Sequence, residues 1–194
     1  MADTFAIIWV GFPGIGKTFL SKKLIELLLN IIYLEIDMFY KLGKSDLTAF
    51  NVAIEEALKT HNVIIGKNHH SEASLNETID IVKSLNKKYF VFNFVPEHFE
   101  TLEKEKKKEF VEMLLDRIEK RNDNSSPLKI IDAASRKRAQ QIIYNGFVKK
   151  YQPPKNCIYL DHIDNMKNLQ IILNTIEADE PNNRGKSKRQ KINL

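Results

Sequence analysis

Residues 11–18 read Gly-Phe-Pro-Gly-Ile-Gly-Lys-Thr and match the pattern G-x-x-x-x-G-K-[ST]. They follow the apolar run 5–10 and precede the segment 19–29, whose apolar residues recur at helical spacing. A strand, a glycine-rich loop and a helix in this order form the context in which the pattern binds nucleotide phosphates. The alternative, a glycine turn that only joins a strand to a helix, is disfavoured by this context. The motif therefore predicts an α/β fold organised around a phosphate site.

Each part of the loop has a predicted task. The backbone N–H groups are expected to point at phosphate oxygens, and the start of the following helix adds its partial positive charge. Lys17 is expected to reach the β- and γ-phosphates, and Thr18 to place its hydroxyl on Mg²⁺. The predicted nucleotide-binding residues of this stretch are Gly11, Pro13, Gly14, Ile15, Gly16, Lys17, Thr18 and Phe19.

Alternating apolar runs and helical patterns cover the rest of the chain. Such alternation predicts right-handed βαβ units, and hence a P-loop kinase-like parallel sheet flanked by helices. The expected further strands are 31–36, 62–66, 88–95 and 157–160. The expected further helices are 45–60, 73–86, one from 103 into the segment 117–124, 133–150 and 169–176.

The charge is unevenly distributed along the 194 residues. Residues 181–194 carry five basic and no acidic residues, which accounts for the whole formal net charge of +5. We predict a P-loop domain over 1–180 and a basic, disordered tail over 181–194. RNA binding, a nuclear signal and a plain disordered end are all open for this tail.

The sequence also disfavours several classes of protein. The single Cys157 rules out an internal disulfide and a multi-cysteine metal site. No apolar run reaches the length of about 18 residues that a membrane span needs, and no signal peptide is evident. We therefore expect an intracellular protein, in cytoplasm or nucleus, with no membrane partner.

Asp37 follows the expected strand 31–36. In open parallel sheets the ligand lies outside the carboxyl ends of the strands, so this carboxylate is placed to act on a substrate. A general base that accepts the proton of an attacking hydroxyl is expected at such a position. The alternative is an N-cap of a short helical turn, which also favours Asp.

A second polar group, residues 67–71, follows the strand 62–66. Its cation, amide and two imidazoles are expected to face the same crevice as Lys17. A metal site is disfavoured, because the adjacent His69 and His70 tend to point apart and no third ligand is evident. A polar loop without a chemical role is the alternative.

Arg117 and Arg121 lie four residues apart and hence on one face of the expected helix, before a polar break at 124–127. Two arginines beside such a loop suit a lid that neutralises the transferring phosphoryl group. The alternative is a pair of surface arginines that bind nearby acids of the same helix. Those acids are Glu112, Asp116 and Glu119.

In this order the motifs resemble the central kinase domain of fungal-type tRNA ligases, which is related to polynucleotide 5′-kinases. The resemblance spans roughly residues 5–155 and rests on order and spacing. The segments that carry it are 11–18, Asp37, 63–70, 117–124 and the Gly-Phe-Val-Lys-Lys-Tyr-Gln-Pro-Pro stretch 146–154. The last segment has no obvious chemistry and indicates kinship only.

The resemblance implies transfer of the γ-phosphate of GTP, or of ATP, to the 5′-OH end of an RNA, as in tRNA splicing or RNA repair, with Mg²⁺ as cofactor. The RNA site it implies comprises Asp37 as general base, Lys67, Asn68 and His70. On the nucleotide side it implies Arg117, Arg121, Asp123 and Asn124. A carboxylate such as that of Asp123 can accept both N1–H and the N2 amino group of guanine, which adenine cannot offer.

The chain departs from the family pattern at several positions. Gly66 and Lys67 stand where family members usually have Asp and Arg, so a carboxylate and a bidentate donor are missing. Asn122 replaces a usual Gly, and residues 125–126 read Ser-Ser where His-Gln is usual. The ligase and phosphodiesterase domains of the full family proteins are absent, so we expect them as separate chains or as parts of a longer protein.

Two other functions remain open on the sequence. A nucleotide or small-molecule kinase shares the P-loop, the base and the lid. A nucleotide-dependent RNA-binding module that has lost catalysis is suggested by Gly66. A switch GTPase is disfavoured, because the Asn-Lys-x-Asp pattern that reads guanine is not found.

Overall fold

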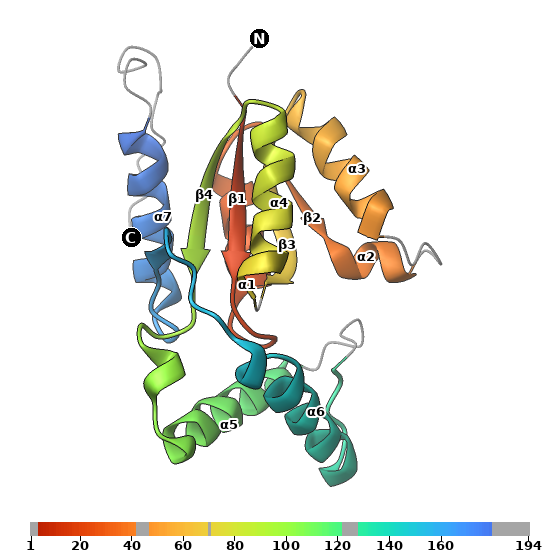
Figure 1. Cartoon of the computed structure of the whole chain (residues 1–194), viewed down its shortest axis with the longest axis vertical. Coiled ribbons are helices and arrows are strands. Elements are labelled where there is room, and N and C mark those ends of the chain that lie inside the picture. The colour runs from red at the N-terminus through yellow and green to blue at the C-terminus, as the bar shows by residue number, and fades with distance from the viewer. Residues whose placement is uncertain (1–3, 42–46, 70, 122–127, 180–194) are drawn as a thin grey trace.

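The strands form one parallel five-stranded sheet in the order β2-β3-β1-β4-β5 (Figure 1). The computed structural model describes residues 4–41, 47–69, 71–121 and 128–179. The strands are β1 (Phe5–Val10), β2 (Ile31–Glu35), β3 (Asn62–His69), β4 (Lys88–Asn93) and β5 (Ile158–Tyr159). The helices are α1 (Lys17–Leu27), α2 (Ile36–Lys41), α3 (Leu47–Leu58), α4 (Glu72–Ser84), α5 (Lys104–Lys120), α6 (Ala133–Gly146) and α7 (Asn165–Ala178), with 3₁₀ turns η1 (Phe99–Thr101) and η2 (Val148–Lys150). The predicted parallel sheet flanked by helices is confirmed.

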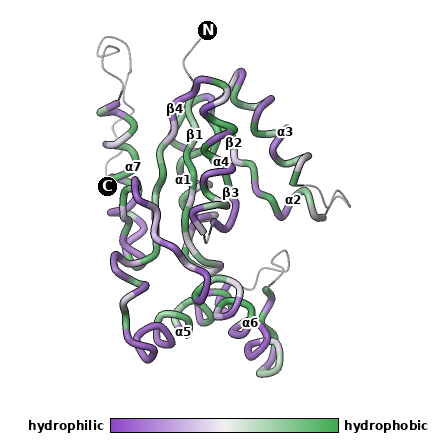
Figure 2. The backbone as a smooth tube through the Cα atoms, in the orientation of Figure 1, coloured by the Kyte–Doolittle hydropathy of each residue, from purple (hydrophilic) through white to green (hydrophobic). Residues whose placement is uncertain are grey.

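Helices cover both faces of the sheet. Helix α1 packs against β2, β3 and α7, whereas α3 and α4 pack against the opposite face. Central strands of such a sheet are buried on both sides, which is why β1 and the residues 63–65 of β3 are apolar without a break. Figure 2 shows these hydrophobic stretches along the strands.

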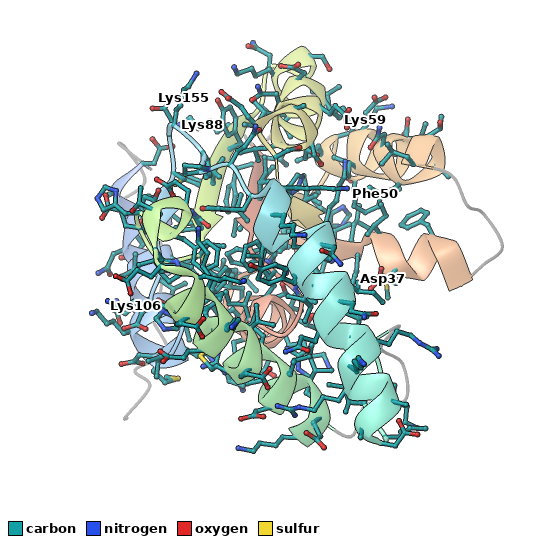
Figure 3. All side chains as sticks on the ribbon, turned by 60° about the horizontal axis from the view of Figure 1, so that its bottom comes forward. Asp37, Phe50, Lys59, Lys88, Lys106 and Lys155 are labelled. Atoms are coloured by element: carbon teal, nitrogen blue, oxygen red, sulfur yellow. The ribbon has the colours of Figure 1, made fainter. Side chains whose placement is uncertain are left out.

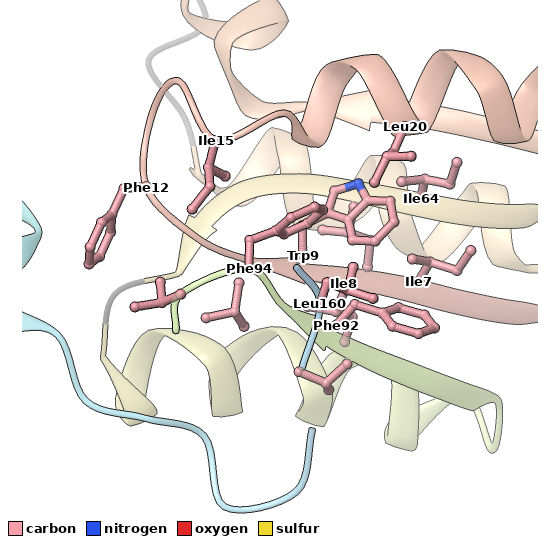
Figure 4. Close-up of a cluster of buried hydrophobic side chains, with 14 of the residues drawn as sticks. Ile7, Ile8, Trp9, Phe12, Ile15, Leu20, Ile64, Phe92, Phe94 and Leu160 are labelled. Carbon is pink, nitrogen blue, oxygen red and sulfur yellow. The ribbon is translucent and has the colours of Figure 1, made fainter. Parts of the chain in front are cut away.

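Trp9 in β1 lies at the centre of the core (Figure 4). Its ring contacts Phe92 and Phe94, with centroids 5.8 and 5.5 Å away. Its indole Nε1 donates to Ser21 Oγ of α1 at 2.9 Å, so the buried N–H has a partner. The strand that ends in the P-loop is therefore fixed to the helix that starts from it.

Helices α5 and α6 lie together at the carboxyl ends of the strands (Figure 1). Helix α6 starts with a capping box in which Asp132 and Ser135 satisfy each other's backbone N–H groups. We call α5 and α6 the arm. It carries both arginines of the predicted lid.

The structure corrects several predicted boundaries. Strand β2 stops at Glu35, so Asp37 lies inside the first turn of α2 and neither ends a strand nor precedes the helix as its N-cap. Strand β3 continues to His69, because a register shift in its pairing with β1 aligns Val10 with His69. The helix expected over 133–150 ends at Gly146 and is followed by η2.

None of the described helices is long and apolar enough to cross a membrane. The predicted basic tail 181–194 lies outside the described residues.

Candidate functional site

The P-loop connects β1 to α1 through two glycines in the left-handed region. Gly14 has φ +87° and Gly16 has φ +115°, conformations that favour glycine. A Cβ at Gly14 would lie 2.9 Å from the carbonyl oxygen of Leu114 in α5. One at Gly16 would lie 3.1 Å from Asn165 Oδ1 of α7. The loop is thus packed between two helices. Conformation favours glycine at both positions, and at Gly14 the nearby backbone of α5 also leaves no room for a side chain.

Phe12, the second residue of the loop, is completely buried in a cluster of aromatic rings. Its ring packs edge-on against Phe99, Phe110 and Tyr151 at centroid distances of 5.5, 6.1 and 5.4 Å. Phe147 lies 6.4 Å away. Such pairs stabilise beyond the area that they bury, so the cluster anchors the loop.

Two rings of this cluster come from the segment 146–154, for which the sequence suggested no chemistry. Tyr151 also accepts a hydrogen bond from Asn93 Nδ2 at the end of β4, at 2.8 Å. Gln152 Oε1 accepts one from the backbone N–H of Glu72 at 3.2 Å. The segment therefore packs against the P-loop and is hydrogen-bonded to the end of β4 and the start of α4.

Lys17 is held over the loop that precedes it. Its Nζ donates to the carbonyl oxygens of Gly11 and Phe12 at 2.8 and 2.9 Å. The side chain of Ile15 is buried and Gly11 has none, so these residues offer a ligand only their backbone. Phe19, by contrast, is 46% exposed.

The charges around Lys17 come from three other elements. Burial, and then the positive charge of Arg121, lower the pKa of Lys17 to about 7, although Glu35 and Asp37 oppose the shift. The structure thus brings the predicted phosphate-binding lysine, the predicted base and one predicted lid arginine into one electrostatic neighbourhood. These residues lie far apart in the sequence, from which only the expected topology of the sheet suggested that they meet.

Asp37 is half-buried in the first turn of α2. Helix α2 is anchored to α3 by the rings of Phe39 and Phe50, whose centroids are 5.3 Å apart. In Figure 3, which brings the arm to the front, Asp37 lies between α2 and α6. Its carboxylate is therefore at the carboxyl end of the sheet, where the predicted role requires it.

The two arginines of the arm differ in their surroundings. Arg117 Nη1 donates to the carbonyl oxygen of His162, after β5, at 2.7 Å. Burial, and then the charge of Arg121, lower the pKa of Arg117, whereas Asp161 raises it. Arg121 is exposed directly after α5. Closure of a lid is a prediction that these contacts do not test.

The acids proposed as alternative partners of these arginines bind Arg136 of α6. Glu112 and Asp116 lie 2.9 and 2.6 Å from its Nη2. Glu119 lies 2.5 Å from its Nη1. The three carboxylates therefore join α5 to α6, and the expectation that they bind Arg117 or Arg121 is not what the structure shows.

The residues after Gly66 continue the strand instead of forming a loop. Lys67 Nζ lies 3.5 Å from Glu77 Oε2 of α4. His69 is 1% exposed, and its two ring nitrogens bind the carbonyl oxygen of Trp9 and Thr78 Oγ1 at 2.9 Å each. The prediction that both imidazoles face the crevice is therefore wrong for His69.

Three predicted site residues lie outside the described residues, namely His70, Asp123 and Asn124. Asn68 is half-buried within β3, and Pro13 is half-buried in the loop. The roles assigned to all of these residues remain predictions.

Tyr33 and Glu35, on β2, are functional candidates that sequence reasoning missed. The hydroxyl of Tyr33 interacts with the side chains of Thr18, Glu35 and Ser21. Burial and the charge of Glu35 raise the pKa of Tyr33. The available signal was that Tyr33 and Glu35 are alternate residues near the end of the expected strand 31–36 and therefore face the same side of the sheet.

The donor set suits a hard cation that also binds phosphates. No group of three or more His, Cys, Asp or Glu side chains able to hold a metal occurs within 4–41, 47–69, 71–121 and 128–179. Mg²⁺ is typically held by one or two protein oxygens together with substrate phosphates. The hydroxyl of Thr18 and the carboxylates of Glu35 and Asp37 fit that requirement.

A family model described as the tRNA ligase kinase domain matches residues 6–175. The chain belongs to this family. The resemblance inferred from the motifs is confirmed, as is the prediction of an RNA 5′-OH kinase, which is a phosphotransferase. No curated protein sequence matches the chain.

Solved structures show how widely the fold of this tRNA ligase kinase domain is shared. A fungal RNA kinase has a TM-score of 0.65 and 19% identity over 93% of this chain and 89% of that one. The APS kinase of Mycobacterium tuberculosis, solved with AMPPNP and APS, has a TM-score of 0.57 and 15% identity over 91% of this chain and 99% of that one. A chain of the Pnkp1/Rnl/Hen1 RNA repair complex has a TM-score of 0.51 and 19% identity over 80% of this chain and 50% of that chain. At these identities the likeness describes the fold, which is that of P-loop kinases.

Proposed function

We propose that this tRNA ligase kinase domain phosphorylates RNA 5′-OH ends by direct transfer from a nucleoside triphosphate bound at the P-loop. The observation that carries the proposal is the convergence of Lys17, Asp37 and Arg121 at the carboxyl end of the sheet. The three charges come from different elements and suit the three tasks of such a transfer, which are binding phosphate, accepting a proton and neutralising developing charge.

In the proposed step the RNA O5′ attacks the γ-phosphorus while the bond from that phosphorus to the β,γ-bridging oxygen breaks. The O5′ proton passes to the carboxylate of Asp37, and the nucleoside diphosphate leaves. Lys17 exchanges its two carbonyl partners for β- and γ-phosphate oxygens, and Arg121 approaches the transferring group. When bound, Mg²⁺ neutralises phosphate charge, and Thr18 is the side chain proposed to hold it.

The donor and the partners belong to the proposal as well. GTP is the proposed preferred donor, with Asp123 and Asn124 reading the base and ATP as the alternative. The acceptor is an RNA with a 5′-OH end. Ligase and phosphodiesterase activities are proposed to act beside this domain, as separate chains or as other parts of a longer protein.

The test is transfer of labelled γ-phosphate to an RNA oligonucleotide with a 5′-OH, with GTP and ATP in parallel and a 5′-phosphorylated oligonucleotide as control. We expect label on the 5′-OH strand only, and none when EDTA removes Mg²⁺. Asp37→Asn is expected to lower the rate about 10²–10⁴-fold, the usual range for a general base. Asp80→Asn, an exposed carboxylate of α4, is the matched control and should not change it.

Label on a small hydroxyl compound but not on RNA would replace this proposal by a small-molecule kinase. Binding of nucleotide and RNA without any transfer would replace it by a non-catalytic module. Equal rates with GTP and ATP would overturn the donor preference alone.

A further inference from the structure

Gly66 lies at the carboxyl half of β3 beneath the ring of Tyr33. A Cβ built on Gly66 would lie 2.6 Å from both Oη and Cε2 of Tyr33, and 2.8 Å from Cζ. Real Cβ atoms do not approach other atoms so closely, so the tyrosine ring fills the space that any side chain at position 66 would need. The ring of Tyr33 can lie here only because Gly66 has no side chain.

The register of the sheet places Glu35 directly beside this feature. Glu35 pairs with Gly66, and Tyr33 pairs with Ile64, across the parallel strands β2 and β3. Paired residues of adjacent strands face the same side of a sheet, and neighbouring strands lie about 4.8 Å apart. Glu35 therefore stands one strand away from Gly66, on the face that α1 covers and from which Thr18 approaches.

The hydroxyl of Tyr33 lies beside both Glu35 and Thr18. These two side chains interact with it, as does Ser21 of α1. A phenol can donate one hydrogen bond and accept others, so Tyr33 can bind the carboxylate and a hydroxyl of α1 at the same time. Glu35 and Thr18 are thereby brought to one place beside the P-loop.

We propose that Glu35 is the carboxylate that accepts hydrogen bonds from the water ligands of a nucleotide-bound Mg²⁺, and that Tyr33 positions Glu35 and Thr18 for that task. Mg²⁺ keeps several waters when phosphates bind it, and carboxylates near such waters hold the hydrated ion in place. The missing side chain at Gly66 makes room for Tyr33, so the acidic function is served from β2 instead of β3. This inference rests on the proposed nucleotide site, but it requires no particular acceptor.

The test measures cation affinity directly. Mn²⁺, which replaces Mg²⁺ and is detected by electron paramagnetic resonance, is titrated into the full chain with a saturating non-hydrolysable triphosphate analogue. Glu35→Gln keeps the size of the side chain and is expected to weaken Mn²⁺ binding about 10–100-fold, as loss of outer-shell carboxylates does. Its affinity for the analogue in EDTA should stay unchanged.

Two variants complete the comparison on the protein side. Tyr33→Phe keeps the ring but removes the hydroxyl, and it should weaken Mn²⁺ binding by a smaller factor, because Glu35 is then present but not held. Glu26→Gln, on an exposed carboxylate of α1, is the matched control and should bind Mn²⁺ as the unmodified chain does. A Glu35→Gln variant with unchanged Mn²⁺ affinity would overturn the proposal.

A rescue experiment tests the exchange between the two strands. Gly66→Asp alone meets the Tyr33 ring, but combined with Tyr33→Ala it places a carboxylate in the vacated space. Adding both changes to Glu35→Gln is expected to raise the Mn²⁺ affinity at least tenfold above that of Glu35→Gln alone. A folded triple variant that binds no better than Glu35→Gln would refute the exchange.

Failure of the RNA kinase proposal is distinguishable from failure of this one. A chain that binds Mn²⁺ with the analogue and loses that binding in Glu35→Gln, yet labels no RNA, supports the role of Glu35 and overturns the acceptor. A chain that labels RNA with Glu35→Gln unaffected in Mn²⁺ affinity does the reverse.

Discussion

The P-loop and the arm both contribute side chains to one site, but different forces hold them in place. The P-loop is fixed by buried contacts, with Phe12 completely enclosed by other rings and Gly14 against the backbone of α5. The arm is joined across α5 and α6 by Arg136, whose carboxylate partners are 45–55% exposed. Screening by salt weakens exposed ion pairs but does not weaken buried aromatic packing.

This difference indicates how the work is divided. The region that binds phosphates in every turnover is built as part of the core. Helix α5, which carries Arg117 and leads to Arg121, shares the core through buried residues such as Leu114, whereas α6 is joined to α5 by exposed ion pairs that exchange readily with water. Four changes, given from the largest expected effect to the smallest, test this division.

Lys17→Ala should have the largest effect, a fall of about 10³-fold or more in the rate of phosphate transfer, because no other group can replace its charge at the β- and γ-phosphates. Single-turnover transfer to RNA measures it. Lys22→Ala, an exposed lysine of the same helix, is the control. Near-normal transfer by the Lys17 variant would mean that the loop does not hold the donor.

Phe12→Ala should destabilise the fold by about 3–5 kcal/mol, the usual range for removing a buried aromatic side chain. Urea denaturation measures the free energy of unfolding. Phe19→Ala removes the same chemical group from a 46% exposed position and should change the unfolding free energy by less than about 1 kcal/mol. Similar losses in both variants would contradict the view of Phe12 as the anchor of the loop.

Arg121→Ala tests whether the charge of Arg121 affects the protonation of Lys17 in the P-loop. With the pKa of Lys17 at about 7, this amine is mostly neutral at pH 8, so binding of a triphosphate should take up close to one proton. Removing the Arg121 charge raises the pKa of Lys17 and should reduce this uptake. Calorimetry in two buffers of different ionisation enthalpy measures it, with Lys120→Ala as control. Unchanged uptake would show that the arm does not sense the P-loop charge.

Arg136→Ala should have the smallest effect, a loss of about 1 kcal/mol in stability that shrinks as salt is added, since exposed ion pairs contribute little. Thermal melts at low and high salt measure it, with Arg138→Ala, an exposed neighbour in α6, as the comparison. A large loss of stability that does not depend on salt would mean that α6 is held to α5 by buried contacts, as the P-loop is held.

The elements that the sequence predicts well are those that depend on contiguous residues. The P-loop needs its eight residues in order, and β1 and α1 follow from apolar patterns beside it. The course of the strand beyond Gly66 could not be predicted, because Lys67 and Asn68 are polar, and the register shift that keeps them in β3 depends on pairing with β1.

The site is less predictable than the fold for the same reason. Asp37 and Arg121 were found from their place at element ends. The roles of Tyr33 and Glu35 depend on their register against Gly66, and those of Phe147 and Tyr151 on packing against Phe12, none of which a single sequence contains. Arg136 was missed because its partners lie on another helix, 17 to 24 residues earlier.

The contact of the Tyr33 ring with Gly66 makes the two positions interdependent. A side chain at position 66 requires the ring to move, because its Cβ would lie 2.6 Å from Tyr33 Oη and Cε2. Substitutions of residues in contact are generally not additive, so the cost of a side chain at position 66 is set by the residue at position 33. Either position can therefore be engineered only with the other in view.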